Sequence, residues 1–343
     1  MRFSVLCRAV SVLAIGLLLA GSWPAVKSQA EVPGAGKVPV IGVANYGAHP
    51  ILDVIVDAFK ARLRERGLAD GKNVKILWKS VEGDVNLASS VAQSLLNSNV
   101  DVIVSITTPV SQALYKVAKG KVPVVFCGVT DPISAGLVGS WQNTPGSGIT
   151  GTSDRWPYAE QLDLIKQILP SAKRVRFPYN SGEANSQYAL TQVIPLAKER
   201  GLEILPAVAT STVEVRKAVE SLALRGVDVI YVSSDNTVMA GFEAVLKVAY
   251  ERKIPVIVGE SANVERGGLA TYSVNYRRLG EATADLVIRV LHGEEPGTIP
   301  VVTFQGEELY FNRDAAQKMG VTLAPELLQK AKKVYGAPTA ARQ

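Results

Sequence analysis

Apolar and polar positions follow a repeating order along the chain: a short β-branched run, a polar turn, and a stretch with helical periodicity. The run "VPVIGVANYG" (38–47) is continuously apolar until it reaches polar residues, and "HPILDVIVDAFKARLRERG" (49–67) follows it. In the second segment five apolar residues recur at helical spacing: Ile51, Val54, Ile55, Ala58 and Leu63. Continuous apolar strands that alternate with helices are typical of parallel sheets buried on both faces. The pattern predicts an α/β protein.

This order occurs twice. The segment "KRVRFPYNSG" (173–182) with "EANSQYALTQVIPLAKERG" (183–201) repeats the opening strand, turn and helix. Residues 99–129 and 226–261 repeat the next units still more closely, with "NVDVIVSITTP" matching "GVDVIYVSSDN". Two such halves predict two parallel sheets, one in each of two lobes.

The polar turns all lie at the carboxyl ends of their predicted strands. In the first half they read "ANYGAH", "ITTP" and "GVTDP", and in the second half "YNSGEANS", "SSDN" and "GESAN". Open parallel sheets bind ligands beyond this end of their strands. If the lobes face each other, the six turns line a single cleft, and hinge strands between the lobes would let it close around a ligand.

The first thirty residues form a predicted secretory signal. Arg2 and Arg8 precede the apolar run "AVSVLAIGLLLAG", and the small residues "SQA" (28–30) supply a cleavage site. The run is shorter than the roughly 20 residues that span a bilayer. We therefore expect residues 1–30 to be cleaved and the mature protein to be periplasmic. Cys127 is then the sole cysteine, so we expect a buried thiol and no intramolecular disulfide.

Composition and motifs narrow the classes of function. The formal net charge of +6 is spread over mixed-sign helices such as "FKARLRERG", which is typical of solvated faces, and no basic run is interleaved with aromatic residues. We expect no nucleic-acid partner. The octet "YNSGEANS" matches neither of the phosphate-binding motifs G-x-x-x-x-G-K-[ST] and G-x-G-x-x-G. The chain has neither H-E-x-x-H nor G-x-S-x-G and only two histidines, so we expect no metal, no cofactor and no enzymatic activity.

Three segments together resemble a known family. The motifs "VPVVFCGVTDPISAGLV", "YNSGEANS" and "DVIYVSSDNTV", in this order behind a signal peptide, are similar to the periplasmic substrate-binding proteins of ABC transporters that include tryptophan and other aromatic amino acid binders. The resemblance covers about residues 38–323. It departs from the family at Ser181, where proline is common, and at Asn45 and Tyr46, where a glutamine is frequent.

This resemblance implies the type I periplasmic-binding fold, with two Rossmann-like lobes joined by a three-strand hinge. The N-terminal lobe would comprise residues 38–150 plus 277–293, and the C-terminal lobe residues 151–276 plus 294–343. The implied partners are a small solute and a membrane permease, with the binding protein acting as a monomer.

A zwitterionic solute needs donors for its carboxylate and acceptors for its ammonium group. Thr107 and Thr108 precede a predicted helix that starts with Pro109, so hydroxyls and free N–H groups converge where an anion is favoured. We expect these threonines to bind the ligand carboxylate, with Asn185 and Ser186 meeting it from the other lobe. Helix capping is the alternative role for all four.

Asp235 in "SSDN" is the first candidate for the ammonium group, with Glu183 and Glu260 as the other candidates. Capping of the helix that follows Asp235 is the alternative, and the family resemblance favours ligand contact. Asp131 either contacts the ligand or initiates a hinge turn. Aromatic residues, among them Tyr46, Trp156, Tyr158 and Tyr272, could stack on a ligand ring. The predicted ligand-binding residues are Asn45, Tyr46, Thr107, Thr108, Asp131, Glu183, Asn185, Ser186, Asp235, Asn236, Glu260 and Tyr272.

The sequence therefore predicts the solute-binding component of an ABC import system. It would close by hinge motion on an amino acid, with aromatic ones among the candidates, or on a similar zwitterion. Two alternatives remain at this point. One is a sensor subunit that reports the same solute to a membrane receptor, and the other is an exported hydrolase of a small metabolite.

Overall fold

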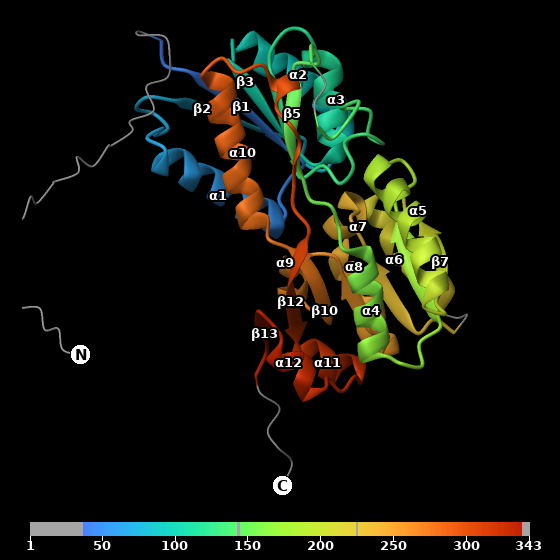
Figure 1. Ribbon diagram of the computed structural model, residues 1–343. Coiled ribbons are helices and arrows are strands. Elements are labelled where there is room, and N and C mark those ends of the chain that lie inside the picture. Colours follow the sequence, from blue (N-terminus) through green and yellow to red (C-terminus); the bar gives the residue numbers. More distant parts are fainter. Residues whose placement is uncertain (1–36, 143–144, 224–225, 338–343) are drawn as a thin grey trace, which may run out of the picture.

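The computed structural model describes residues 37–142, 145–223 and 226–337. The predicted signal, residues 1–30, lies outside them. Over the described part of the chain, two α/β lobes stand one above the other (Figure 1). No helix in these ranges is long and apolar enough to cross a membrane.

The first lobe is built on a six-stranded parallel sheet with strand order β11-β5-β4-β3-β1-β2. Its strands are apolar because helices cover both faces, and β3 and β4 are buried at every position. The elements are β1 (Val40–Asn45), α1 (Pro50–Glu65), β2 (Lys75–Ser80), η1 (Val85–Leu87), α2 (Ala88–Asn97), β3 (Val102–Ile106), α3 (Thr108–Ala118), β4 (Val124–Cys127), β5 (Ile149–Ser153), α10 (Tyr276–Leu291), η2 (Pro296–Thr298) and β11 (Val302–Thr303).

The second lobe has a seven-stranded sheet of order β13-β12-β10-β9-β8-β6-β7, in which only the β10–β12 pair is antiparallel among the described strands. Its elements are α4 (Tyr158–Ile168), β6 (Arg174–Tyr179), α5 (Ala184–Glu199), β7 (Glu203–Val208), α6 (Thr212–Ala223), β8 (Val229–Val232), α7 (Asn236–Ala240), α8 (Phe242–Arg252), β9 (Val256–Val258), α9 (Ser261–Glu265), β10 (Ala270–Val274), β12 (Gly306–Asn312), α11 (Arg313–Met319), α12 (Pro325–Gln329) and β13 (Lys333–Tyr335). Each lobe has its own hydrophobic core.

The chain passes between the lobes three times: after β5, between β10 and α10, and between β11 and β12. Two of the predicted lobe boundaries differ from this arrangement. Residues 151–153 belong to the first sheet, because β5 pairs with β4 through Cys127 and Thr152. Residues 302–303 also belong to the first sheet, because β11 pairs with β5, so the last crossing follows Thr303 instead of residue 293. A two-residue strand carries too little periodicity to be recognised in a sequence.

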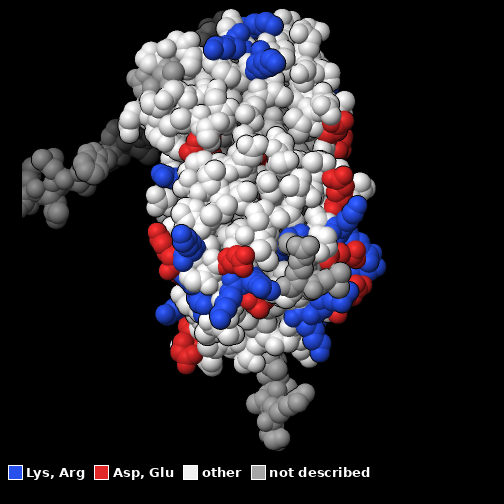
Figure 2. Space-filling model, turned by 90° about the vertical axis from the view of Figure 1, so that its right-hand side faces the viewer, with Lys and Arg blue, Asp and Glu red and all other residues white. Residues whose placement is uncertain are grey.

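Charged side chains are interspersed on the face shown in Figure 2, where Lys and Arg alternate with Asp and Glu over the lower lobe. Several of them form ion pairs, such as Arg200 with Asp163 at 2.7 Å and Arg216 with Glu220 at 2.6 Å. These are mixed-sign solvated surfaces, as the helix sequences indicate.

Helices α1 and α10 pack side by side on the first sheet (Figure 1). Gly280 lies in the middle of α10, where a Cβ atom would come within 2.3 Å of the carbonyl oxygen of Ile55. Glycine in a helix normally costs about 1 kcal/mol relative to alanine. Here the close approach of the two backbones requires it.

We predict that Gly280→Ala lowers the free energy of unfolding by about 1–3 kcal/mol, although helix propensity alone favours alanine. Urea denaturation measures the change. The neighbouring substitution Glu281→Ala is the control and should stay within about 0.5 kcal/mol of the wild type. A Gly280→Ala protein more stable than the wild type would contradict this packing.

Candidate ligand-binding cleft

A cavity of about 530 Å³, its open mouth included, lies between the carboxyl ends of the two sheets. Both lobes line it, the first through the turns after β1, β3, β4 and β5, and the second through the turns after β8 and β9 and the start of α5. This is the location that parallel sheets predict. Seven predicted residues lie in its wall: Tyr46, Thr107, Thr108, Asn185, Asp235, Asn236 and Glu260.

Five predicted residues, Asn45, Asp131, Glu183, Ser186 and Tyr272, are not among the residues that line the cavity. Asp131 accepts a hydrogen bond from the Ser134 backbone N–H at 2.6 Å, so it performs the turn role given as its alternative. Tyr272 lies in β10 opposite Leu309, and its carbonyl oxygen accepts from Gln161. Successive side chains of a strand point to opposite faces of the sheet, and the sequence alone does not show which face of β10 meets the cleft.

Glu183 has a role that sequence reasoning missed. Its side chain is buried and accepts five hydrogen bonds, one from Asn185 Nδ2 and two each from Asn236 and Thr237. Four of these donors, with distances of 2.6 to 3.0 Å, belong to the first residues of α7. Glu183 therefore ties the turn after β6 to the turn after β8 and has its accepting capacity filled by its own lobe.

Asp235 combines both roles considered for it. It caps α7, because Oδ1 accepts from the Val238 backbone N–H at 2.7 Å, and Oδ2 accepts from Asn180 N and Ser186 Oγ. It also lines the cavity. Burial, and next the charge of Glu183, raise the pKa of Asp235 to about 8. The capping role is thus confirmed, whereas direct ligand contact stays a prediction.

One end of the cavity presents polar groups that have no partner in the protein. Thr107 Oγ1 and Asn185 Oδ1 are both buried without a hydrogen bond. The Asn185 amide orientation is determined by its neighbours, because Nδ2 donates to the Ser234 carbonyl and to Glu183, which are acceptors only. Oδ1 is therefore an acceptor directed at the space that remains. The N-terminus of α3 lies beside Thr107, whose side chain does not cap it.

The backbone of Thr107 is strained, with φ 82° and ψ 156°. Only glycine adopts this region readily, and other residues there cost about 1–3 kcal/mol. The strain turns the chain sharply between β3 and α3 and leaves the hydroxyl at the cavity. Strain of this kind clusters at functional sites.

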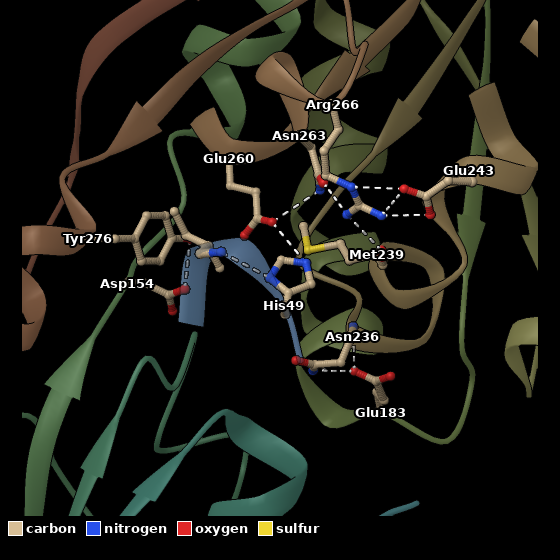
Figure 3. A network of polar contacts seen from close by, with 11 residues as sticks. His49, Asp154, Glu183, Asn236, Met239, Glu243, Glu260, Asn263, Arg266 and Tyr276 are labelled. Atoms are coloured by element: carbon tan, nitrogen blue, oxygen red, sulfur yellow. Dashed lines mark hydrogen bonds and ion pairs between the residues drawn. The ribbon is translucent and has the colours of Figure 1, made fainter. Parts of the chain in front are cut away.

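Another part of the wall, called the acidic end below, holds the carboxylates Asp154 and Glu260 (Figure 3). Asp154 follows β5, and its Oδ2 accepts from Trp156 Nε1 and from the Tyr276 hydroxyl, both at 3.1 Å. Its Oδ1 is buried without a hydrogen bond of good geometry, although the Thr130 hydroxyl lies nearby. Burial raises the pKa of Asp154 to about 6.

Glu260 joins this end from the second lobe, where it is the N-cap residue of α9. Its Oε1 accepts from Asn263 Nδ2 at 3.1 Å and lies 3.2 Å from His49 Nε2 of the first lobe. His49 Nδ1 accepts from the Ile51 N–H, so the proton of this neutral ring is on Nε2. Burial, then the charge of Arg266, lower the pKa of His49 to about 4, whereas burial and the charge of Asp154 raise the pKa of Glu260 to about 8.

Sequence reasoning missed several residues of this end. His49 stands in the polar turn "ANYGAH" but was not among the predicted ligand-binding residues, and it is also the N-cap residue of α1. Asp154 lies in the interlobe crossing, where the only sequence signal is an isolated carboxylate directly after an apolar strand.

Cys127 is fully buried as predicted, and burial raises the pKa of its thiol to about 12. The described residues contain no cluster of histidine, cysteine or carboxylate groups suited to a metal ion.

Two lobes, three crossings and a closed interlobe cavity define the class: a two-lobed solute-binding protein with the type I periplasmic-binding fold, which more distant solute-binding proteins share. The family model for ABC transporter substrate binding proteins matches residues 40–335. The chain belongs to that family.

Other proteins are similar to this chain in sequence and in structure. A tyrosine-binding protein of Clostridioides difficile (strain R20291) is 35% identical over 279 residues, which cover 81% of this chain and 80% of the relative. A Streptococcus pneumonia ABC domain in complex with L-Trp is 33% identical, with a TM-score of 0.83 over 87% of this chain and 100% of that chain. A ligand-free, open substrate-binding protein of Clostridium difficile is 31% identical, with a TM-score of 0.64 over 88% and 100%.

The lobe arrangement resembles the ligand complex more than the open protein. The two solved structures are nearly equal in identity to this chain, yet their TM-scores differ by about 0.2 (0.83 against 0.64). The 3.2 Å contact of His49 with Glu260 across the cleft belongs to such a closed arrangement.

We predict that Thr107→Gly is more stable than Thr107→Ala by about 1–3 kcal/mol, because only glycine relieves the strained backbone. Both variants lack the hydroxyl, so both should bind ligand equally weakly. Chemical denaturation gives the stabilities, and calorimetric titration gives the affinities. Equal stabilities of the two variants would contradict the strain.

We also predict that the closed form of the protein loses stability as pH rises from 6.5 to 8. The pKa values of Glu260 and Asp235, both raised to about 8, make the folded state bind more protons than the unfolded state in this window. His49, whose pKa is lowered, acts below pH 6.5, where it favours unfolding as pH falls. Glu260→Gln should flatten the slope in urea denaturation, and an unchanged slope would exclude Glu260 as its source.

Proposed function

We propose that this protein is the exported receptor of an ABC import system and closes on an aromatic amino acid, which it delivers to a membrane permease. The observation that carries the proposal is the unpartnered polar end of the closed cavity, formed by Thr107 from one lobe and Asn185 from the other. The two relatives whose names give a ligand, tyrosine and L-Trp, support the substrate class.

The main-chain groups of the amino acid bind at this polar end. A carboxylate needs donors, and the Thr107 hydroxyl and the N-terminus of α3 supply them without a competing cap. An ammonium group needs acceptors, and Asn185 Oδ1 supplies one beside the buried carboxylate of Asp235. Ammonium and carboxylate share one carbon atom, so a site for one must lie next to a site for the other.

The side chain of the amino acid then extends toward the acidic end. Apolar side chains from both lobes line the cavity: Leu52 and Ile55 of α1 and Met239 of α7. Trp156 and Tyr276 add aromatic surface. Such a wall suits a flat ring, which gains both burial and aromatic contact.

The mechanism is binding and hinge closure without bond chemistry. The chain segments between β5 and α4, β10 and α10, and β11 and β12 are the positions at which the lobes can rotate. Closure brings Thr107 of the first lobe and Asn185 of the second lobe together around the ligand. A permease can then distinguish the closed form from the open form.

We predict that L-tyrosine and L-tryptophan raise the melting temperature of the protein, with a stabilisation of about 2.7 kcal/mol at 100 times Kd. N-acetyl-L-tyrosine, which lacks the ammonium group, should have no effect at the same concentration. Ser90→Ala, an exposed change on α2, is the control and should respond as the wild type does.

Chromatography of the incubated solutes completes this test. A receptor returns them unchanged, whereas product formation would support the hydrolase alternative. Absence of any thermal shift with all twenty amino acids would overturn the proposed function.

A further inference from the structure

Most donors near the acidic end of the cavity are already committed, and the two that are not, His49 Nε2 and the Thr130 hydroxyl, make no hydrogen bond of good geometry to Glu260 or to Asp154 Oδ1. Trp156 Nε1 and the Tyr276 hydroxyl donate to Asp154 Oδ2, and Asn263 Nδ2 donates to Glu260 Oε1. Asp154 Oδ1 is left buried without a hydrogen bond, in a side chain that is 6% exposed. Leaving a buried acceptor unpaired is costly, so the position calls for a donor from outside the protein.

No cation in the wall compensates these carboxylates. The residues that line the cavity, all of them within the described ranges, include three carboxylates but neither lysine nor arginine. Arg266 lies behind Glu260 and is occupied elsewhere. It donates to both carboxylate oxygens of Glu243 at 2.6 to 3.1 Å, to Asn263 Oδ1 at 2.7 Å and to the Met239 carbonyl (Figure 3).

This end therefore repels a ligand carboxylate. Because the ammonium group sits on the same carbon atom as that carboxylate, it stays with the carboxylate at the polar end formed by Thr107 and Asn185. What reaches the acidic end is the far end of the ligand side chain. We propose that Asp154 and Glu260 accept a hydrogen bond from the ring of the bound aromatic amino acid, so that the protein selects rings bearing an O–H or N–H group over phenylalanine. This inference rests on the proposed function and specifies its substrate class.

Three observations support this assignment. Tyrosine and L-Trp, the ligands named for two relatives, both carry a donor on the ring. Glu260 reaches the cavity from the second lobe and Asp154 from the crossing after β5, so the acceptors assemble when the lobes close. Burial raises the pKa values of Asp154 and Glu260, in agreement with two carboxylates shielded from solvent in this cavity.

The charged and titratable groups around the pair come from every element packed against it. They are His49 at the start of α1, Tyr276 at the start of α10, Arg266 after α9 and Glu243 in α8. Of these, His49 is neutral and Arg266 is paired with Glu243. None of them donates to Asp154 Oδ1, and the neutral Thr130 hydroxyl nearby makes no hydrogen bond of good geometry to it.

The test compares ligands on the wild-type protein by calorimetric titration. We expect L-phenylalanine to bind at least about 100-fold more weakly than L-tyrosine and L-tryptophan, because it leaves the buried acceptors unpaired. Equal affinity for all three would overturn the inference while leaving the proposed function intact. Tyramine binding as tightly as L-tyrosine would also overturn it, because the amine would then occupy the acidic end. Failure of all aromatic amino acids to bind would instead contradict the proposed function.

A substitution gives an independent readout. In Asp154→Asn the amide oxygen must face Trp156 Nε1, which only donates, so the amide NH₂ group replaces Oδ1 at the cavity. L-Tryptophan, whose indole N–H only donates, should lose at least about 30-fold in affinity. L-Tyrosine should lose less, because its phenol oxygen can also accept.

Glu260→Gln is the second variant, for which the same order of losses is expected, should Asp154→Asn fold poorly. Asp163→Asn removes an exposed carboxylate of the second lobe that pairs with Arg200, and it is the matched control. It should leave both affinities unchanged. Equal affinities for L-tryptophan in the wild type and in both cavity variants would overturn the inference.

Discussion

Closure of the two lobes buries polar atoms that the protein itself does not pair. Thr107 Oγ1, Asn185 Oδ1 and Asp154 Oδ1 all lie in side chains that line the interlobe cavity, and none has a hydrogen-bond partner of good geometry. Each such atom costs about 1–3 kcal/mol in the closed empty protein. A ligand that supplies the missing partners removes this cost only in the closed form. Ligand binding and closure are therefore one equilibrium.

The second lobe holds one of these atoms, Asn185 Oδ1, in position. Glu183 accepts five hydrogen bonds that join the turn after β6 to the start of α7, and Asp235 adds three more from the same turns. Glu183 and the Ser234 carbonyl both accept from Asn185 Nδ2 and so fix the orientation of this amide, whose Oδ1 faces the cavity. Asp154 Oδ1, in contrast, lies in the wall of the same cavity without a hydrogen bond of good geometry. Oxygens that already accept hydrogen bonds from the protein position their neighbours, whereas oxygens without a partner are free to bind a ligand.

Sequence reasoning found the fold because the pattern was repeated and consistent. Continuous apolar strands, helices of period 3.6 and polar turns at the strand ends predict two parallel sheets with a cleft between them. The structure agrees, apart from the antiparallel β10–β12 pair. Single-residue roles were harder to predict. Asp235 and Glu183 look alike in sequence as carboxylates in polar turns. The bond of Asp235 from Asn180 and the bond of Glu183 from Asn236 both depend on the approach of two turns more than 50 residues apart. Asp154 was missed because its importance arises from Trp156, Tyr276 and the second lobe, none of which its local sequence reveals.

Small-angle X-ray scattering with and without L-tyrosine tests the central claim most directly. If unpaired buried atoms hold the empty protein open, the ligand-free protein should scatter with a larger radius of gyration than this closed structure gives. Saturating L-tyrosine should then lower the radius to the closed value. Ligand-free scattering that already matches the closed structure would contradict the account.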